Sequence, residues 1–119
     1  MTGAGPGLGR AVAVRLARDG ARQLLVDIDP ANAENAAEEV GGQGAQAQAL
    51  TADVTDDRGC ERVVEAAGDG RIVNFGSELS ENPRPERVVY AASKGAVRSL
   101  TKAWVTGHTV AADGGWTMW

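Results

Sequence analysis

The chain is poor in the residues that define several classes of protein. Cys60 is the only cysteine, which excludes an intrachain disulfide framework and is typical of a reducing compartment. It falls within a predicted helix, where we expect its side chain to be buried or half-buried. His108 is the only histidine, with no second type of metal ligand clustered near it, so no metal site is expected. Aromatic residues make up 4% of the chain. Its core must therefore consist mainly of Val, Leu and Ala, which suits helices packed on a sheet.

The sequence also lacks a basic cluster and a long apolar run. Lys and Arg total 12 and Asp and Glu total 16, giving a formal charge of −4 with the basic residues scattered. A partner such as nucleic acid or an anionic membrane is therefore not expected, since either requires grouped cations. No segment approaches the about 18 apolar residues of a membrane span, and no signal-peptide pattern opens the sequence. We expect a soluble cytoplasmic protein.

The pattern that is present alternates helices and strands. A length of 119 residues fits one domain, so residues 1–119 are predicted to be a single domain. Periodicity and turn residues predict helices over 8–19, 30–40, 56–67 and 86–104, and strands over 23–27, 45–52 and 71–75. Asp29 is placed to cap the second helix, with Pro30 at its first position. This order predicts an α/β fold with a parallel sheet and crossover helices.

Three of these helices carry apolar residues at helical spacing, and we expect those residues to face the core. They are Leu8, Ala11, Val12 and Leu16 in the first helix, Cys60, Val63, Val64 and Ala67 in the third, and Val89, Ala92, Ala96, Leu100 and Ala103 in the last.

A glycine-rich loop precedes the first helix, with the spacing Gly3-x-x-x-Gly7-x-Gly9. Such a loop lets backbone N–H groups approach a pyrophosphate at the positive end of the helix dipole. Leu8 stands where the G-x-G-x-x-G pattern, started from Gly3, needs glycine. The alternative to a pyrophosphate site is an ordinary glycine-rich turn before a helix.

Asp27 follows this loop at the end of the next strand. A carboxylate there can accept hydrogen bonds from an adenosine ribose diol and repel a 2′-phosphate. No Lys or Arg precedes Gly9 in the loop, so NAD is favoured over NADP. The alternative is that Asp27 merely ends its strand.

The last predicted helix contains Tyr90-Ala91-Ala92-Ser93-Lys94. Tyr90 and Lys94 are four residues apart and share a helix face, where a cation favours the phenolate needed for acid–base catalysis. Ser77 lies just past a predicted strand, where ligands bind in open α/β sheets, and its hydroxyl could hold a substrate carbonyl. Ser80 and Ser93 are the competing serines.

Together, these motifs resemble the short-chain dehydrogenase/reductase family in that family's order. They are Thr2-Gly3-x-x-x-Gly7-x-Gly9, Asp27, Asp53-Val54, Arg71-Ile72-Val73-Asn74-x-x-Ser77, Tyr90-x-x-x-Lys94 and Thr106-Gly107 with Asp113-Gly114-Gly115. The resemblance extends from the first residue to the last.

The resemblance implies a Rossmann-like sheet and hydride transfer between NAD(H) and a secondary alcohol or ketone. Tyr90 would be the general acid/base, Lys94 would lower its pKa and hold the nicotinamide ribose, and Ser77 would position the carbonyl. The resemblance also implies cofactor contacts for Gly3, Gly7, Leu8, Gly9, Asp27, Asp53, Val54, Tyr90 and Lys94. It further implies that the chain can form a homo-oligomer, in which Trp116 and Trp119 pack against a partner subunit; the alternative is that these two side chains simply lie exposed.

The chain departs from the family pattern by lacking whole segments. The first strand is reduced to Met1, the segment with the catalytic asparagine is absent between Ala67 and Gly70, and the substrate-covering segment is absent after Trp104. We therefore expect an incomplete sheet and weak or no turnover. The alternative function is a non-catalytic remnant that at most binds nucleotide or associates with full-length relatives.

Overall fold

The computed structural model describes residues 1–71 and 74–104. It divides into two compact units, Met1–Gly70 and Arg71–Trp119. Whether residues 1–119 form a single domain stays a prediction. The tail 105–119, with His108, Asp113, Gly114, Trp116 and Trp119, lies outside the described residues.

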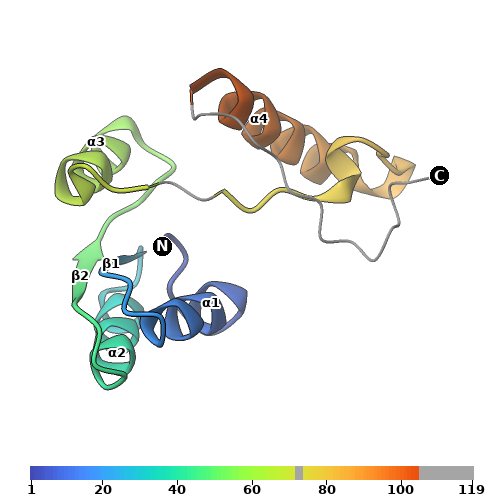
Figure 1. Ribbon diagram of the computed structural model, residues 1–119. Coiled ribbons are helices and arrows are strands. Elements are labelled where there is room, and N and C mark those ends of the chain that lie inside the picture. The colour runs from blue at the N-terminus through green and yellow to red at the C-terminus, as the bar shows by residue number, and fades with distance from the viewer. Residues whose placement is uncertain (72–73, 105–119) are drawn as a thin grey trace. The chain divides into compact units, whose positions relative to one another are not determined.

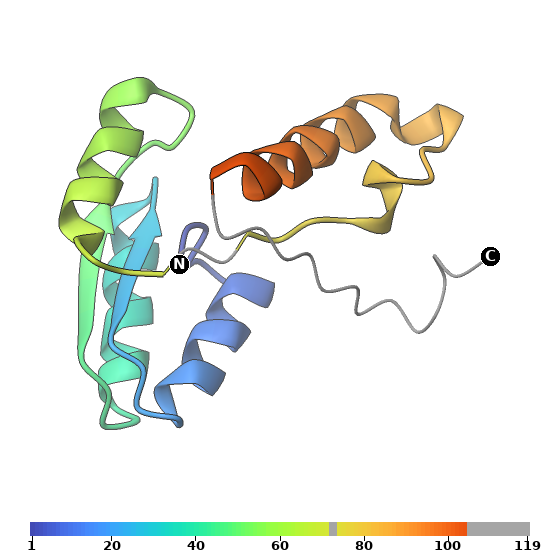
Figure 2. The same cartoon turned by 45° about the horizontal axis from the view of Figure 1, so that its top comes forward.

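Unit 1 is a small parallel sheet with helices (Figures 1 and 2). Its elements in chain order are α1 (Leu8–Ala17), β1 (Gln23–Asp27), α2 (Pro30–Gly41), β2 (Ala47–Thr51) and α3 (Asp57–Ala67). β1 and β2 pair in parallel, with Gln23 opposite Ala47 and Asp27 opposite Thr51, and α2 is the crossover between them. The predicted α/β class, its parallel pairing and all five of these elements are confirmed, each within a few residues.

A short backbone segment takes the position of a first strand. Thr2 forms an isolated parallel bridge with Val26. The Val26 N–H donates to the Met1 carbonyl at 2.8 Å, and the Ala4 N–H donates to the Val26 carbonyl at 3.1 Å. The incomplete sheet expected from the sequence is therefore found in the described residues, with Met1–Ala4 lying along β1.

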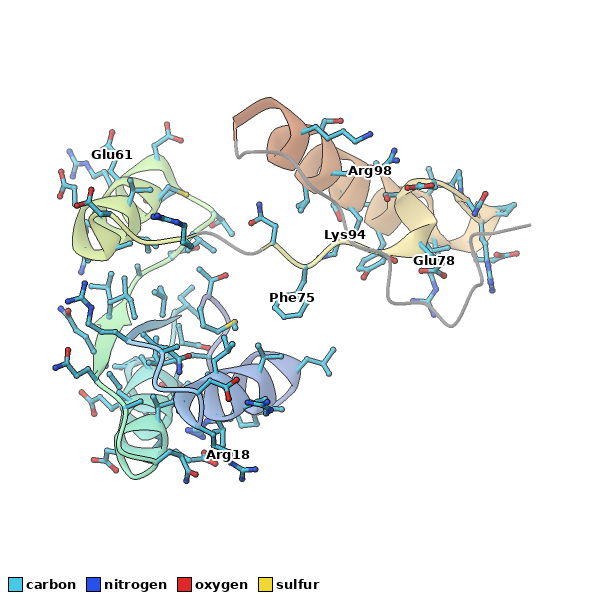
Figure 3. All side chains as sticks on the ribbon, viewed as in Figure 1. Arg18, Glu61, Phe75, Glu78, Lys94 and Arg98 are labelled. Atoms are coloured by element: carbon cyan, nitrogen blue, oxygen red, sulfur yellow. The ribbon has the colours of Figure 1, made fainter. Side chains whose placement is uncertain are left out.

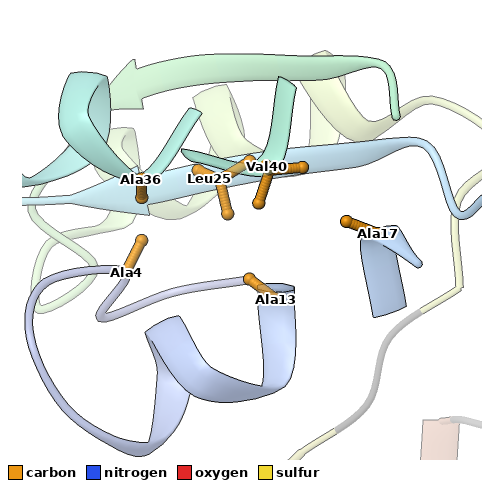
Figure 4. Packing of buried hydrophobic residues seen from close by; sticks show 6 residues of the cluster. All are labelled: Ala4, Ala13, Ala17, Leu25, Ala36 and Val40. Carbon is orange, nitrogen blue, oxygen red and sulfur yellow. The ribbon is translucent and has the colours of Figure 1, made fainter. Parts of the chain in front are cut away.

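The core of unit 1 lies where α1 and α2 meet β1. It is built from small and aliphatic side chains: Ala4, Ala13, Ala17, Leu25, Ala36 and Val40 (Figure 4). The face predicted for the first helix is wrong, since Leu8 is 79% exposed and Leu16 is also exposed. Ala13 and Ala17 are buried instead, because their short side chains let the helix approach Leu25 and Val40 closely.

Helix α3 is less buried than its sequence pattern predicts. Val64 is 61% exposed, and Val63 and Ala67 are half-buried. Cys60 is exposed, so its predicted packing role is wrong; its thiol lies 3.4 Å from the Val54 carbonyl. Among the described residues, α3 contacts β1 and has few other neighbours.

The described part of unit 2 consists of an extended segment, two short 3₁₀ turns and a long helix. The turns are η1 (Glu78–Ser80) and η2 (Pro85–Arg87), and the helix is α4 (Val88–Trp104), which confirms the last predicted helix. Of the strand predicted over 71–75, residues 72–73 lie outside the described residues, and Arg71, Asn74 and Phe75 are not in a strand. The prediction is wrong for these three residues, since the sheet among the described residues consists of β1 and β2.

The buried side of α4 also differs from the predicted stripe. Val89 is 86% exposed, and Ala92 and Ala96 are exposed as well. Ala91 is buried, and Lys94 and Arg98 are half-buried on the side that packs against η1. An ion pair of 2.7 Å between Arg98 and Glu81 joins the helix to the end of that turn. The side chains of Leu100 and Ala103 lie outside the described residues.

Candidate functional site

The glycine loop folds tightly onto the start of α1. Gly3 has φ of 64° and Gly7 has φ of 141°, conformations that favour glycine. A Cβ on Gly9 would lie 2.4 Å from the Gly3 carbonyl oxygen, so only glycine allows this approach. Leu8 points away from the core and is largely exposed. The loop therefore presents backbone rather than side chains at the helix N-terminus.

That helix N-terminus is left open by the sequence. Gly7, at the N-cap of α1, offers no side-chain cap, and the first turn holds no acidic residue. By contrast, Asp29 caps α2 by accepting a hydrogen bond from the Ala31 N–H, and Asp56 caps α3 in the same way from the Gly59 N–H. The first N–H groups of α1 thus lack the carboxylate partner that the other two helices have.

Asp27 lies beside this loop at the carboxyl end of β1. Its Oδ2 accepts a hydrogen bond of 2.9 Å from the Gly5 N–H, and its Oδ1 accepts one of 3.0 Å from the Asp29 N–H. Partial burial alone would raise the pKa of Asp27. These two N–H donors, with the Asn32 amide and the Ile28 backbone, outweigh it and hold the pKa below its usual value. Asp27 is therefore ionised at neutral pH.

Two residues that the sequence did not single out complete this cluster. The Asn32 side chain, on the first turn of α2, lies 3.5 Å from Asp27 Oδ1 through its Nδ2. Gly5 is buried, and a Cβ there would lie 2.8 Å from that same Nδ2. The available signals were an additional glycine within the loop and an amide among the alanines that follow Pro30.

Asp53 and Val54 follow β2 at the same edge of the sheet. The Ala52 N–H donates to the Asp27 carbonyl at 3.1 Å, which joins the two strand ends. Asp53 Oδ1 accepts hydrogen bonds from the Thr55 hydroxyl at 2.7 Å and the Thr55 N–H at 2.8 Å, and these lower the pKa of Asp53. Val54 is 45% exposed. The loop is thus held by its own hydrogen bonds and presents an apolar side chain.

In unit 2, Ser77 caps the η1 turn. Its hydroxyl donates to Glu78 Oε2 at 2.8 Å and accepts from the Leu79 N–H at 3.3 Å. The competing Ser93 donates its hydroxyl proton to the Tyr90 carbonyl at 2.7 Å, which is bonding within the helix. Ser77 thus lies in a loop, as the sequence predicts, whereas Ser93 lies within α4. The catalytic role of Ser77 stays a prediction.

Tyr90 and Lys94 share the first half of α4, as the sequence spacing predicts. Lys94 Nζ donates to the Phe75 carbonyl at 2.9 Å and lies 5.7 Å from the centre of the Tyr90 ring. Figure 3 labels Lys94 and Phe75. Because Phe75 is two residues before Ser77, this hydrogen bond ties the lysine to the segment that carries the serine. Tyr90 is 44% exposed, so its ring remains accessible.

The described residues contain neither a metal-binding cluster nor a membrane-spanning helix. Residues 1–71 and 74–104 hold no group of three His, Cys, Asp or Glu side chains arranged to bind a metal ion. Within the same ranges no helix has the length and apolar character needed to cross a membrane.

The fold and the loop together define a Rossmann-type α/β arrangement: parallel strands, a crossover helix and a glycine turn that opens a helix. The model of the short chain dehydrogenase family matches residues 1–69 and again residues 66–110. The chain belongs to the short-chain dehydrogenase family.

Individual relatives share this pattern over part of their length. Levodione reductase of Leifsonia aquatica is 41% identical over 91 residues, which is 70% of this chain and 34% of that protein. The 1-deoxy-11-beta-hydroxypentalenate dehydrogenase of Streptomyces exfoliatus is 41% identical over 69 residues, 58% of this chain and 25% of that protein. The chain thus spans a quarter to a third of these curated relatives.

Among solved structures, NAD⁺-bound xylitol dehydrogenase is similar with a TM-score of 0.71 and 25% sequence identity. The similarity covers 85% of this chain and 60% of that one.

Proposed function

We propose that the chain binds NAD through unit 1 and that its function is hydride transfer between NAD(H) and a secondary alcohol or ketone. The observation that carries the proposal is the hydrogen bond from the Gly5 N–H to Asp27 Oδ2. It joins an ionised carboxylate, suited to a ribose diol, to a loop that leads into an uncapped helix N-terminus, suited to a pyrophosphate. The residues present therefore fit a dinucleotide.

The charge at Asp27 supports NAD rather than NADP. An ionised carboxylate repels a 2′-phosphate and accepts hydrogen bonds from free hydroxyls. Arg10 is the first basic residue after the loop, and its Nε lies 3.4 Å from Glu39 Oε2, so its guanidinium already has an acidic partner. NAD⁺ in the similar xylitol dehydrogenase structure agrees with this preference.

Unit 2 supplies the groups that move and stabilise a proton. When bound, NAD(H) would donate or accept the hydride. In reduction, the Tyr90 hydroxyl donates its proton to the carbonyl oxygen as the alcohol forms; in oxidation, the tyrosine takes the proton back. The Lys94 ammonium stabilises the phenolate, and the Ser77 hydroxyl donates a hydrogen bond to the substrate oxygen. Substrate binding must therefore replace the Ser77–Glu78 hydrogen bond.

The test separates binding from turnover. Affinity for NAD and NADP is measured by calorimetry on wild type and Asp27→Ala, and NADH oxidation with a panel of ketones is followed on wild type and Tyr90→Phe. Tighter binding of NAD than NADP, lost in Asp27→Ala, with turnover lost in Tyr90→Phe, supports the proposal. Absence of NAD binding by wild type overturns it. Binding without Tyr90-dependent turnover selects the alternative, a nucleotide-binding remnant without catalysis.

A further inference from the structure

Asn32 lies between two parts of the nucleotide site in unit 1. It is the third residue of α2, and its Nδ2 faces Asp27 Oδ1 at 3.5 Å. Asp27 is already bonded through Oδ2 to the Gly5 N–H and through Oδ1 to the Asp29 N–H. The Asn32 amide adds a donor to Oδ1, next to the one from the backbone.

The same amide covers Gly5. This glycine is buried and its φ is not in the left-handed region, so the backbone conformation alone would accept a side chain. The obstacle is space. A Cβ on Gly5 would lie 2.8 Å from Asn32 Nδ2, 3.0 Å from Asn32 Cγ and 3.2 Å from Asp27 Oδ2. Asn32 therefore fills the space that the missing side chain leaves.

We propose that Asn32 is a positioning residue for nucleotide binding: its amide orients the Asp27 carboxylate and holds the glycine loop against it. This inference rests on the proposed NAD site and deepens it. A loop, a strand end and a helix then move as one body, so the carboxylate and the loop meet the nucleotide with their relative geometry already set. Preorganisation of this kind increases affinity because less ordering is left for the binding step.

Substitutions at Asn32 test the role directly. Asn32→Ala removes one donor to a charged acceptor and should weaken NAD binding about threefold to tenfold. The matched control is Asn35→Ala, the same change at an exposed position of α2, which should bind as wild type does. A second variant, Asn32→Asp, places a carboxylate against Asp27 and should weaken binding at least tenfold. A urea-denaturation curve of each variant establishes that it is folded under the conditions of the binding assay.

Gly5→Ala supplies a second and independent readout. Alone it should weaken NAD binding about tenfold or more, because the new methyl group meets the Asn32 amide. In the double variant with Asn32→Ala the two losses should be less than multiplicative, since the obstructing amide is gone. The Gly5 amide resonance in ¹H–¹⁵N spectra should also shift in Asn32→Ala and stay in place in Asn35→Ala.

The positioning role of Asn32 and the proposed NAD binding can fail separately. Failure of wild type to bind NAD overturns the proposed function and the positioning role together. Normal binding by wild type with unchanged binding by Asn32→Ala and Asn32→Asp overturns the positioning role alone. Multiplicative losses in the Gly5 and Asn32 pair, with no shift of the Gly5 resonance, also overturn it.

Discussion

Gly59, in the first turn of α3, meets the tightest obstacle among the described glycines. A Cβ there would lie 1.6 Å from the Asp53 carbonyl oxygen and 2.6 Å from its carbon. Atoms of this kind reach contact at about 3.5 Å, and the obstacle is backbone rather than a flexible side chain. The Gly59 N–H also donates to Asp56 Oδ1 at 2.6 Å, which fixes the helix start against the loop. Gly59→Ala must therefore displace either α3 or the loop.

Two effects of opposite sign determine the stability of this variant. Alanine favours a helix over glycine by about 1 kcal/mol, while forcing a methyl group into a filled site costs typically about 1–3 kcal/mol and more when backbone must move. Because the overlap here is with backbone, we expect the second effect to dominate, with a net loss of about 2 kcal/mol. For a unit of this size, that is a fall in Tm of roughly 10 °C.

The matched control is Gly41→Ala in α2, where a Cβ would meet nothing within 4 Å. It should be neutral or stabilising by up to about 0.5 kcal/mol. Urea denaturation followed by circular dichroism measures both variants. Equal stability of Gly59→Ala and Gly41→Ala would show that the site beside the Asp53 carbonyl has room for a methyl group. Since the displaced loop carries Asp53 and Val54, Gly59→Ala should also weaken NAD binding, and Gly41→Ala should not.

Three further outcomes are expected. The hydrogen bonds to Asp27 lower its pKa, so its ionised form stabilises the fold at pH values above the unfolded-state pKa of about 4. This contribution is lost as the pH falls through the lower pKa of the folded state. Acid should therefore reduce the unfolding free energy of wild type more than that of Asp27→Asn; parallel urea-denaturation curves across pH would contradict this. Gly9→Ala, whose Cβ would meet the Gly3 carbonyl, should weaken NAD binding at least tenfold by calorimetry, whereas wild-type affinity would show that the loop adapts. Asp56→Ala removes the N-cap of α3 and should lower the unfolding free energy in urea by about 1 kcal/mol. Asp57→Ala, at the neighbouring residue that does not cap the helix, should lower it less; equal losses would argue against capping.

The sequence predicted the elements of unit 1 because their signals are local. The apolar run before Asp27 identifies a strand, and Asp29 with Pro30 identifies a helix start, whatever surrounds them. Which face of a helix is buried is not local. The stripes of α1 and α4 satisfied helical spacing, yet alanines rather than Leu8 or Val89 are buried, because close packing depends on what lies opposite.

The candidate site shows the same division. Asp27 and the glycine loop were identified from spacing, because a strand end and the next helix start are fixed by chain connectivity. Asn32 was not identified, since its role depends on Gly5 lacking a Cβ and on a contact between α2 and the loop. The hydrogen bond from Lys94 to the Phe75 carbonyl could not be predicted either, because it joins residues 19 apart whose proximity depends on the fold.

Parallel pairing between β1 and β2 also sets one of the loop-closure costs of folding unit 1. Every pair in the register, from Gln23 with Ala47 to Asp27 with Thr51, is separated by the same length of chain. Once α2 closes that one loop, each further pair forms without additional closure entropy. Docking of Met1–Ala4 on Val26 closes a second loop, through α1, and so carries a closure cost of its own. The amides of β1 and β2 that pair with each other should thus exchange with solvent more slowly than those of the glycine loop, which leaves the loop free to open while the sheet stays formed.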